Sequence, residues 1–212
     1  MARTIAVLAV QGAFIEHEAK LRELGANVVE LRQAADLEQE FDGLVLPGGE
    51  STTQAKLLRE LGMFDELKRR IEAGLPVLAT CAGLILLAKE VEGTGDLSGL
   101  NPAAAKERLA VHGFGTLDVN VERNAYGRQL GSFHAQEPWT KEAHDIAGVE
   151  GDEQLPLTFI RAPRITKLGA AATPIIEHDG YPVAVLQGKQ LGAAFHPELD
   201  SDARLHELFL SL

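Results

Sequence analysis

Short apolar runs alternate with amphipathic stretches of helical period through the first half of the chain. The apolar runs predict strands, and the stretches between them predict helices. The predicted strands are Ile5–Val10, Val28–Leu31, Gly43–Leu46 and Pro76–Ala79. The predicted helices are Phe14–Leu24, Thr52–Leu61, Phe64–Ala73 and Ala82–Ala88. This alternation is typical of strand-helix-strand units on a parallel sheet.

The second half has a different texture, with short strand-like runs that are close together and turn signals between them. Asp179-Gly180 and Gly188-Lys189 are predicted to be hairpin turns, and residues 202–210 form an amphipathic helix. The predicted strands here are Leu117–Val121, Leu157–Ile160, Val183–Leu186 and Leu191–Phe195. We expect an α/β fold, with a mostly parallel central sheet flanked by helices and extra antiparallel strands in the second half.

The sequence gives no sign of a boundary between two domains. There is no internal repeat, linker or low-complexity tract, so we expect residues 1–212 to form one domain. Gly25 is placed to end the first helix, and Ser51 with Gln54 has the spacing of a capping box for the helix that follows.

The charge balance excludes several partners. The chain has 31 acidic and 20 basic residues, a formal charge of -11, which repels phosphate backbones and anionic lipids. We therefore expect no nucleic-acid and no membrane partner. The N-terminal apolar run is too short to span a membrane and lacks a signal-peptide cleavage pattern, which predicts a cytoplasmic protein.

Cys81 is the single cysteine, so the chain forms no internal disulfide and no site with two thiolates. It lies in Thr80-Cys81-Ala82-Gly83, where a predicted strand gives way to a helix. A sharp turn of this kind lifts a nucleophile clear of a sheet, and a helix N-terminus favours a thiolate. A free cysteine is more often a small buried hydrophobe, so position alone makes Cys81 only a candidate.

A candidate base follows the last predicted strand, in Phe195-His196-Pro197-Glu198. Pro197 favours an extended chain at His196, and residues two apart in an extended chain project to the same side. Glu198 is therefore expected to orient the His196 ring, leaving its other nitrogen to face a thiol. Taken singly, each residue has a structural alternative, a capping histidine and a solvated carboxylate. The remaining six histidines, among them His17, His112 and His206, are expected at the surface.

A third strand-to-helix junction is the glycine turn Pro47-Gly48-Gly49-Glu50-Ser51. Glycines let backbone N–H groups point outward, so those of Gly49 and Ala82 are candidates to hold the oxyanion formed when a thiolate attacks an amide. A phosphate-binding loop is the alternative, although the turn lacks the Gly-Lys-Ser/Thr ending and the Gly-x-Gly-x-x-Gly spacing of nucleotide sites.

Together these segments resemble the class I, triad-type glutamine amidotransferases, and more narrowly the glutaminase subunits of pyridoxal 5'-phosphate synthase. The resemblance extends from near the N-terminus to near the C-terminus. The matching strings are Val10-Gln11-Gly12-Ala13, Pro47-Gly48-Gly49-Glu50-Ser51-Thr52-Thr53, Thr80-Cys81-Ala82-Gly83-Leu84, Glu122-Arg123-Asn124-Ala125-Tyr126-Gly127-Arg128-Gln129, Phe159-Ile160-Arg161-Ala162-Pro163 and Phe195-His196-Pro197-Glu198.

The resemblance implies a flavodoxin-like class I amidotransferase fold and a triad of Cys81, His196 and Glu198. It also implies a substrate, L-glutamine, and a pyridoxal 5'-phosphate synthase subunit that accepts the ammonia, with no cofactor and no metal. Gln11 is implied to lie near the oxyanion. The implied glutamine-binding residues are Gly49, Glu50, Ser51, Arg123, Ile160 and Arg161.

Two departures from the family pattern stand out. Ala79 replaces a glycine that many relatives have two residues before the nucleophile, which predicts a slightly tighter turn. The segment 96–115 is longer than usual, which indicates a surface insertion.

Three other functions stay open at this point. One is a free-standing cysteine hydrolase of γ-glutamyl or peptide bonds. Another is a glutaminase that serves a different ammonia acceptor. The third is a non-catalytic anion-binding module that uses the Gly48-Gly49 turn.

Overall fold

The computed structural model describes residues 2–92, 113–123, 125, 131–149, 151 and 153–212. Its main sheet has seven strands in the order β10-β11-β12-β4-β3-β1-β2. The strands from β12 to β2 are parallel neighbours, and β10 and β11 extend the sheet in antiparallel fashion. The bounds are β1 Thr4–Leu8, β2 Asn27–Leu31, β3 Gly43–Leu46, β4 Val77–Thr80, β10 Thr173–His178, β11 Tyr181–Gln187 and β12 Gln190–Ala193. The predicted α/β fold with a mostly parallel sheet is confirmed.

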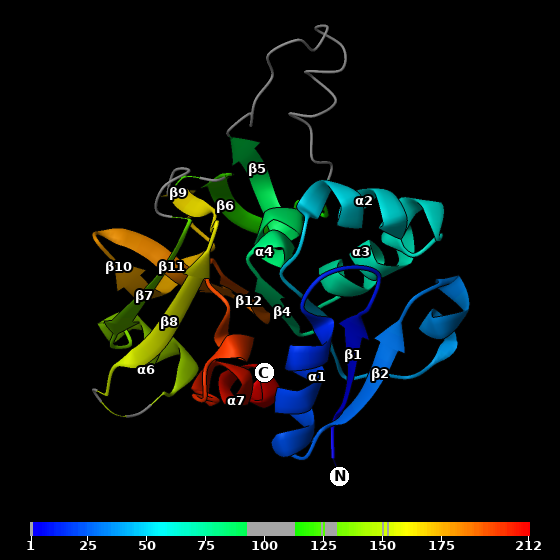
Figure 1. Ribbon diagram of the computed structural model, residues 1–212, viewed down its shortest axis with the longest axis horizontal. Coiled ribbons are helices and arrows are strands. Elements are labelled where there is room, and N and C mark those ends of the chain that lie inside the picture. Colours follow the sequence, from blue (N-terminus) through cyan, green and yellow to red (C-terminus); the bar gives the residue numbers. More distant parts are fainter. Residues whose placement is uncertain (1, 93–112, 124, 126–130, 150, 152) are drawn as a thin grey trace, which may run out of the picture.

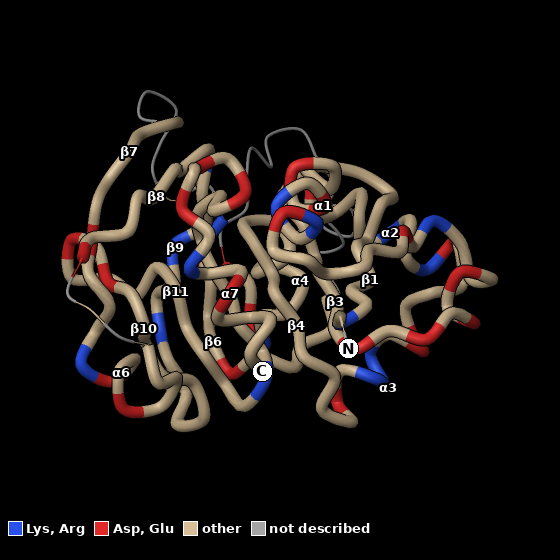
Figure 2. The backbone as a smooth tube through the Cα atoms, turned by 90° about the horizontal axis from the view of Figure 1, so that it is seen from below, with Lys and Arg blue, Asp and Glu red and all other residues tan. Residues whose placement is uncertain are grey.

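The middle of this sheet is apolar because helices cover both of its faces. Strands β1, β3 and β4 carry no charged residue, whereas charges follow the helices and loops around them (Figure 2). All four residues of β3 and of β4 are buried. Near-continuous apolar runs are what a parallel strand buried on both faces requires.

Helix α1 lies on one face of the main sheet, and helices α2 and α3 lie on the other. The bounds are α1 Phe14–Glu23, α2 Ser51–Glu60, α3 Phe64–Glu72, α4 Ala82–Leu87, α6 Lys141–Ala147 and α7 Arg204–Ser211. The chain moves from β1 to β2 in one direction across the sheet and from β3 to β4 in the other. Since such crossovers are right-handed, α1 and the pair α2 and α3 lie on opposite faces. Helices α1 and α7 lie side by side (Figure 1).

Two smaller sheets belong to the second half. Strands β5 Ala88–Glu92, β6 Leu117–Glu122 and β9 Arg164–Leu168 form one, and β7 Ser132–Glu137 pairs with β8 Leu155–Ile160 in the other. Both predicted hairpin turns are confirmed, because two residues join β10 to β11 and two join β11 to β12. Asp179 and Gly180 have φ of 51° and 75°, as a type I′ turn needs.

Several elements were not predicted. Strands β5, β7, β9 and β10, helix α6 and the short 3-10 helix Ala34–Glu38 have no counterpart among the predicted elements. Strand β7, with the sequence SFHAQE, alternates between exposed and half-buried positions and is therefore weakly apolar. The end of the predicted helix Ala82–Ala88 also differs, because α4 ends at Leu87 and strand β5 begins at Ala88.

One cluster of buried hydrophobic side chains connects the main sheet to the strands of the second half. It includes Ile5 and Leu78 of the main sheet together with Val119 and Phe159 of the smaller sheets. The packing therefore joins the two halves, with the loops that follow β1, β3, β4 and β12 at the carboxyl edge of the parallel strands.

Ile5 tests this account of the core, because it is fully buried in β1 and packs near Phe209 of α7. Replacing Ile5 by Ala is expected to lower the free energy of unfolding by about 2–5 kcal/mol, through lost burial and the cavity left behind. Ile146→Ala, on the exposed side of α6, is the matched control and is expected to cost about 0.5 kcal/mol or less. Urea unfolding followed by circular dichroism measures both, and equal losses would contradict the assigned core.

Candidate active site

Four loops at the carboxyl edge of the parallel strands surround one pocket of about 580 Å³. The strand order reverses between β1 and β3, and the crevice at such a point is where open α/β sheets bind ligands. The pocket is lined by Gln11, Ala13, Gly48, Gly49, Glu50, Ser51, Thr52, Cys81, Ala82, Ile85, Arg123, Ile160, Arg161 and His196. Every candidate site residue named from the sequence is on this wall except Glu198.

Cys81 sits in a strained turn between β4 and α4. Its φ is 48° and its ψ is -100°, a backbone region that residues with a side chain rarely adopt. Its N–H donates to the carbonyl of Ala193 in β12 at 2.8 Å, and Gly83 fits against the carbonyl of Leu46, where a Cβ would approach to 2.0 Å. These contacts hold the turn, and Ala79 does not prevent it. Strain of this kind clusters at functional sites.

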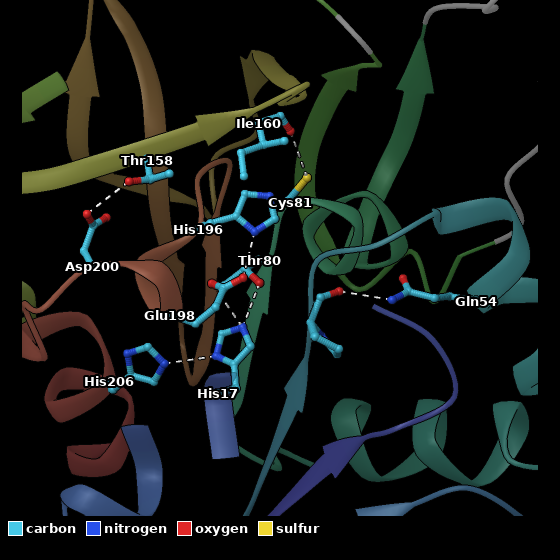
Figure 3. A network of polar contacts seen from close by, with 11 residues as sticks. His17, Gln54, Thr80, Cys81, Thr158, Ile160, His196, Glu198, Asp200 and His206 are labelled. Carbon is cyan, nitrogen blue, oxygen red and sulfur yellow. Dashed lines mark hydrogen bonds and ion pairs between the residues drawn. The ribbon is translucent and has the colours of Figure 1, made fainter. Parts of the chain in front are cut away.

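His196 lies between Cys81 and Glu198 (Figure 3). Its Nδ1 is 2.7 Å from Oε1 of Glu198, and the thiol of Cys81 is near enough to the ring to raise its pKa. The N–H of His196 donates to the carbonyl of Thr158 in β8 at 2.8 Å, which anchors the backbone. The three side chains are buried and lie in the order sulfur, imidazole, carboxylate.

The surroundings favour the charged form of His196. Burial lowers the pKa of His196, but the hydrogen bonds to Cys81 and Glu198 and the charge of Glu198 outweigh it and raise the pKa to about 10. The imidazolium therefore persists at neutral pH. An imidazolium beside a sulfur stabilises the thiolate, which is the nucleophilic form of cysteine.

The backbone that joins His196 to Glu198 differs from the predicted one. Residues Pro197–Leu199 form a 3-10 turn, η2, so Glu198 does not lie on an extended strand beside His196. Proline fits the first position of a helical turn because its φ is already suitable. The contact forms nevertheless, since the turn folds the carboxylate back under the ring.

The glycine turn after β3 supplies backbone donors to the pocket. Within the described part of the chain, neither the N–H of Gly49 nor that of Ala82 donates a hydrogen bond. Both residues line the pocket beside Cys81, where an oxyanion hole is expected. Gly48 lies directly against His196, because a Cβ there would come within 2.4 Å of the ring carbon Cε1.

Gln11 and Gln54 fix this glycine turn. Oε1 of Gln11 accepts from the N–H of Glu50 at 2.8 Å, and Nε2 of Gln54 donates to the carbonyls of Gln11 and Pro47 at 3.0 and 3.2 Å. Gly49 has room only for a hydrogen atom, since a Cβ would meet Oε1 of Gln11 at 2.4 Å. The loop after β1 thus holds the loop after β3 in shape.

Glu50, and not Ser51, caps helix α2. Its carboxylate accepts from the N–H groups of Thr52 and Thr53 at 3.1 and 2.7 Å. The predicted capping box of Ser51 and Gln54 is wrong, because Gln54 is used by the neighbouring loops. Burial raises the pKa of Glu50, but hydrogen bonds from Thr53 and Thr52 lower it more, so the group is a carboxylate.

Arginine side chains and one carbonyl complete the wall. Nη2 of Arg123 is 3.2 Å from both Oε1 of Glu50 and Oγ1 of Thr52. The carbonyl oxygen of Ile160 is 4.0 Å from Sγ of Cys81 (Figure 3). Arg161 has φ of 46° and is hydrogen-bonded through its N–H to the carbonyl of Gly131. Ser51 is buried, and its hydroxyl makes no hydrogen bond among the described residues.

Part of the predicted site lies outside the described residues. This holds for Asn124, for Tyr126–Gln129 and for residues 93–112, which include His112 and most of the expected insertion.

The prediction that His17 and His206 lie at the surface is wrong. Both are fully buried behind Glu198, on α1 and α7. The helical period gave a signal for this position, because His17 falls on the same face as Phe14 and Leu21. A histidine on the apolar face of an amphipathic helix is expected to be buried with that face.

No group of three or more His, Cys, Asp or Glu side chains among the described residues is arranged to hold a metal ion. None of the helices in the part of the chain that the structure describes is both long and apolar enough to cross a membrane.

Comparisons with known proteins agree with this geometry. The chain is 50% identical over 207 residues to the pyridoxal 5'-phosphate synthase subunit PdxT of Desulfitobacterium hafniense, covering 97% of this chain and 91% of that protein. It is 47% identical over 209 residues to the subunit of the same name from Bifidobacterium longum, covering 97% and 98%.

Solved structures share the fold. A crystal structure of a glutamine amidotransferase superposes with a TM-score of 0.80 at 40% identity, covering 98% of this chain and 97% of that one. PurLQS from Thermotoga maritima, at 14% identity and a TM-score of 0.65, shares the fold alone, covering 100% and 99%.

The family model of the SNO glutamine amidotransferases matches residues 7–212, nearly the whole chain. The chain therefore belongs to the SNO glutamine amidotransferase family.

Proposed function

We propose that this chain hydrolyses L-glutamine to L-glutamate and ammonia through a thioester on Cys81, and passes the ammonia to a pyridoxal 5'-phosphate synthase subunit. The observation that carries the proposal is the buried chain from Cys81 through His196 to Glu198, set beside free N–H groups in a pocket. A nucleophile, its base and an orienting carboxylate are the parts that acyl transfer from an amide requires.

The reaction divides into two acyl transfers at one sulfur. The Cys81 thiolate attacks the γ-amide carbon of glutamine, and the N–H groups of Gly49 and Ala82 hold the resulting oxyanion. The carbon–nitrogen bond then breaks as His196 gives its proton to the leaving nitrogen, which departs as ammonia. Water next attacks the thioester carbon, His196 takes a proton from that water, and the thiolate is released with glutamate.

The rest of the pocket suits the other end of glutamine. The α-carboxylate of glutamine would pair with the guanidinium of Arg123 or Arg161. The α-ammonium of glutamine would donate to an acceptor such as the Glu50 carboxylate. The Ile160 carbonyl, close to Sγ, is an acceptor for the amide nitrogen. Gln11 acts indirectly, by holding the turn that carries Gly49. These residue roles are part of the proposal.

The proposed partner rests on the relatives. Two proteins about half identical to this chain are named as subunits of pyridoxal 5'-phosphate synthase, which makes vitamin B6 synthesis the proposed destination of the ammonia. A free-standing cysteine hydrolase differs in one testable respect, because it needs no partner for full activity.

Two further expectations belong to the proposal. We take residues 1–212 as one glutaminase domain, since a single hydrophobic cluster joins both halves. We place it in the cytoplasm, where a single catalytic thiol stays reduced.

Removing the sulfur tests the proposed nucleophile. Cys81→Ala is expected to abolish glutamate release, by at least a thousandfold, while the melting temperature changes little because the side chain is small. Activity is measured on glutamine with and without the synthase subunit. Hydrolysis that persists in Cys81→Ala contradicts the assignment, and full wild-type activity without the partner favours the independent hydrolase.

The pKa of His196 predicts how Cys81 reacts with iodoacetamide. Because that pKa is raised to about 10, the imidazolium is present below this pH and disappears as the pH rises through it. His196→Ala is therefore expected to slow alkylation at pH 6.5 by at least about tenfold, with the difference fading at alkaline pH. The single cysteine makes the rate a measure of one site. Equal rates at pH 6.5 would contradict the paired state.

Arg123 tests the proposed contact with the glutamine carboxylate. Arg123→Ala is expected to raise KM for glutamine about tenfold or more, the value of a charge-assisted hydrogen bond, with a smaller change in kcat. Arg69→Ala, an exposed residue of α3 paired with Glu66, is the matched control and should leave KM unchanged. Steady-state kinetics with the synthase present measures both, and an unchanged KM in Arg123→Ala would remove this residue from the binding site.

A further inference from the structure

A second buried polar cluster lies behind the triad, on the side of Glu198 away from the pocket. It consists of His17 on α1, Thr80 at the end of β4 and His206 on α7 (Figure 3). All three side chains are fully buried, and none of them lines the pocket. Burying polar groups costs free energy unless each has a hydrogen-bond partner, so the contacts of this cluster need an explanation.

His17 contacts the residue before Cys81 and also the carboxylate of Glu198. Its Nε2 is 3.1 Å from Oγ1 of Thr80, the residue before the nucleophile, and 3.3 Å from Oε2 of Glu198. The other carboxylate oxygen, Oε1, faces Nδ1 of His196 at 2.7 Å. Among the described residues, Oε2 has no hydrogen bond of ordinary geometry, so His17 is the group that faces it. The carboxylate is thus held between two imidazoles.

The carboxylate fixes the protonation of the two histidines behind it. A carboxylate only accepts, so the tautomer of His17 that carries its hydrogen on Nε2 is the one that places a donor beside Oε2 of Glu198. Burial lowers the pKa of His17, partly opposed by Glu198, so the ring is neutral and its Nδ1 is an acceptor. Nε2 of His206, 3.0 Å away, must then donate to it. His206 is left with a bare Nδ1, which matches the absence of a partner for this atom among the described residues.

Helix α1 is held against η2 by a second contact. Lys20, one turn after His17, donates from Nζ to the carbonyl of Asp200, and its Nζ is 3.4 Å from the carbonyl of Asp202. Lys20 is itself buried. The position of His17 relative to Glu198 is therefore fixed by the backbone on both sides.

We propose that His17 is a positioning residue of the glutaminase: its neutral imidazole, hydrogen-bonded to Thr80, places Nε2 against Oε2 of Glu198 at 3.3 Å, keeps that side chain an oriented carboxylate, and so maintains the His196 imidazolium and the Cys81 thiolate. This inference rests on the proposed function. His17 touches neither the pocket nor the reacting atoms, and it acts through Glu198.

Other titratable and charged groups near His17 influence its pKa. Facing it are Glu198 from η2, His196 from the segment after β12, His206 from α7, and Glu16 and Lys20 from its own helix. Burial raises the pKa of Glu198, but the charge that His17 carries when protonated, together with the hydrogen bond and charge of His196, lowers that pKa overall. Loss of the donor weakens the effect of the carboxylate on His196, so the imidazolium is lost at a lower pH and the thiolate that it stabilises forms only at a higher pH.

Two amide variants separate the effect of the N–H donor at Nε2 from the effect of the volume that the imidazole fills. In His17→Gln the side-chain amide nitrogen reaches the position of Nε2, whereas in His17→Asn it reaches only that of Nδ1. The midpoint of iodoacetamide alkylation of Cys81 is expected to rise by about one pH unit in His17→Asn and to stay at the wild-type value in His17→Gln. With the synthase present, kcat is expected to fall about tenfold in His17→Asn and to recover in His17→Gln, with KM unchanged in both.

A matched control and the wild type complete the design. His178→Asn removes a mostly buried histidine that pairs with Glu137 and does not line the pocket, and should leave the alkylation curve unchanged. A wild-type midpoint in folded His17→Asn overturns the proposal, as does a midpoint that shifts equally in His17→Gln. If His17→Asn does not fold, the Gln variant decides: a wild-type curve supports the donor and a shifted curve overturns it. Absence of glutaminase activity in the wild type would instead overturn the proposed function, because the alkylation curve needs no glutamine.

Discussion

The buried carboxylate of Glu198 is the group on which the arrangement of the site depends. A charge removed from water is costly unless hydrogen bonds and opposite charge compensate for it, and removing one partner of such a group is more damaging than never having buried it. Glu198 is compensated by imidazoles on two sides. The charge on His196, and through it the state of the sulfur, follows from that compensation. In the proposed mechanism, helices α1 and α7, which do not line the pocket, act on its chemistry through Glu198.

The parallel sheet explains how residues so distant in sequence meet. Residues 11, 49, 81 and 196 each follow a parallel strand, and parallel strands end at the same edge. Gln11 and Gln54 then join the neighbouring loops to one another. The second half adds strands that carry Ile160 and Arg161 to the opposite wall of the same pocket. Shape at the pocket is consequently set by backbone geometry and leaves little to flexible side chains.

The sequence predicted the parallel half well, because continuous apolar runs and helical periodicity are strong signals. It also placed Cys81, His196 and the glycine turn at strand ends, where the structure has them. It failed for β7, which alternates only between exposed and half-buried residues, and for β9, which buries one residue of five. It failed for the cap of α2, because Gln54 serves contacts that cross from one loop to another. It failed for His17 and His206, whose burial depends on two helices that are neighbours only in the folded chain.

Gly48 has a consequence that reaches beyond its turn. The imidazole of His196 rests where a β-carbon of residue 48 would be. The separation between the glycine loop and the base is therefore set by a missing methyl group, and not by any attraction between them. A lineage that gained a side chain at this position would have to move either the ring or the loop, and each movement would separate the proton carrier from the donors that await the substrate oxygen. Conservation of glycine here would thus record a steric limit on catalysis, even though the residue contributes no functional group of its own.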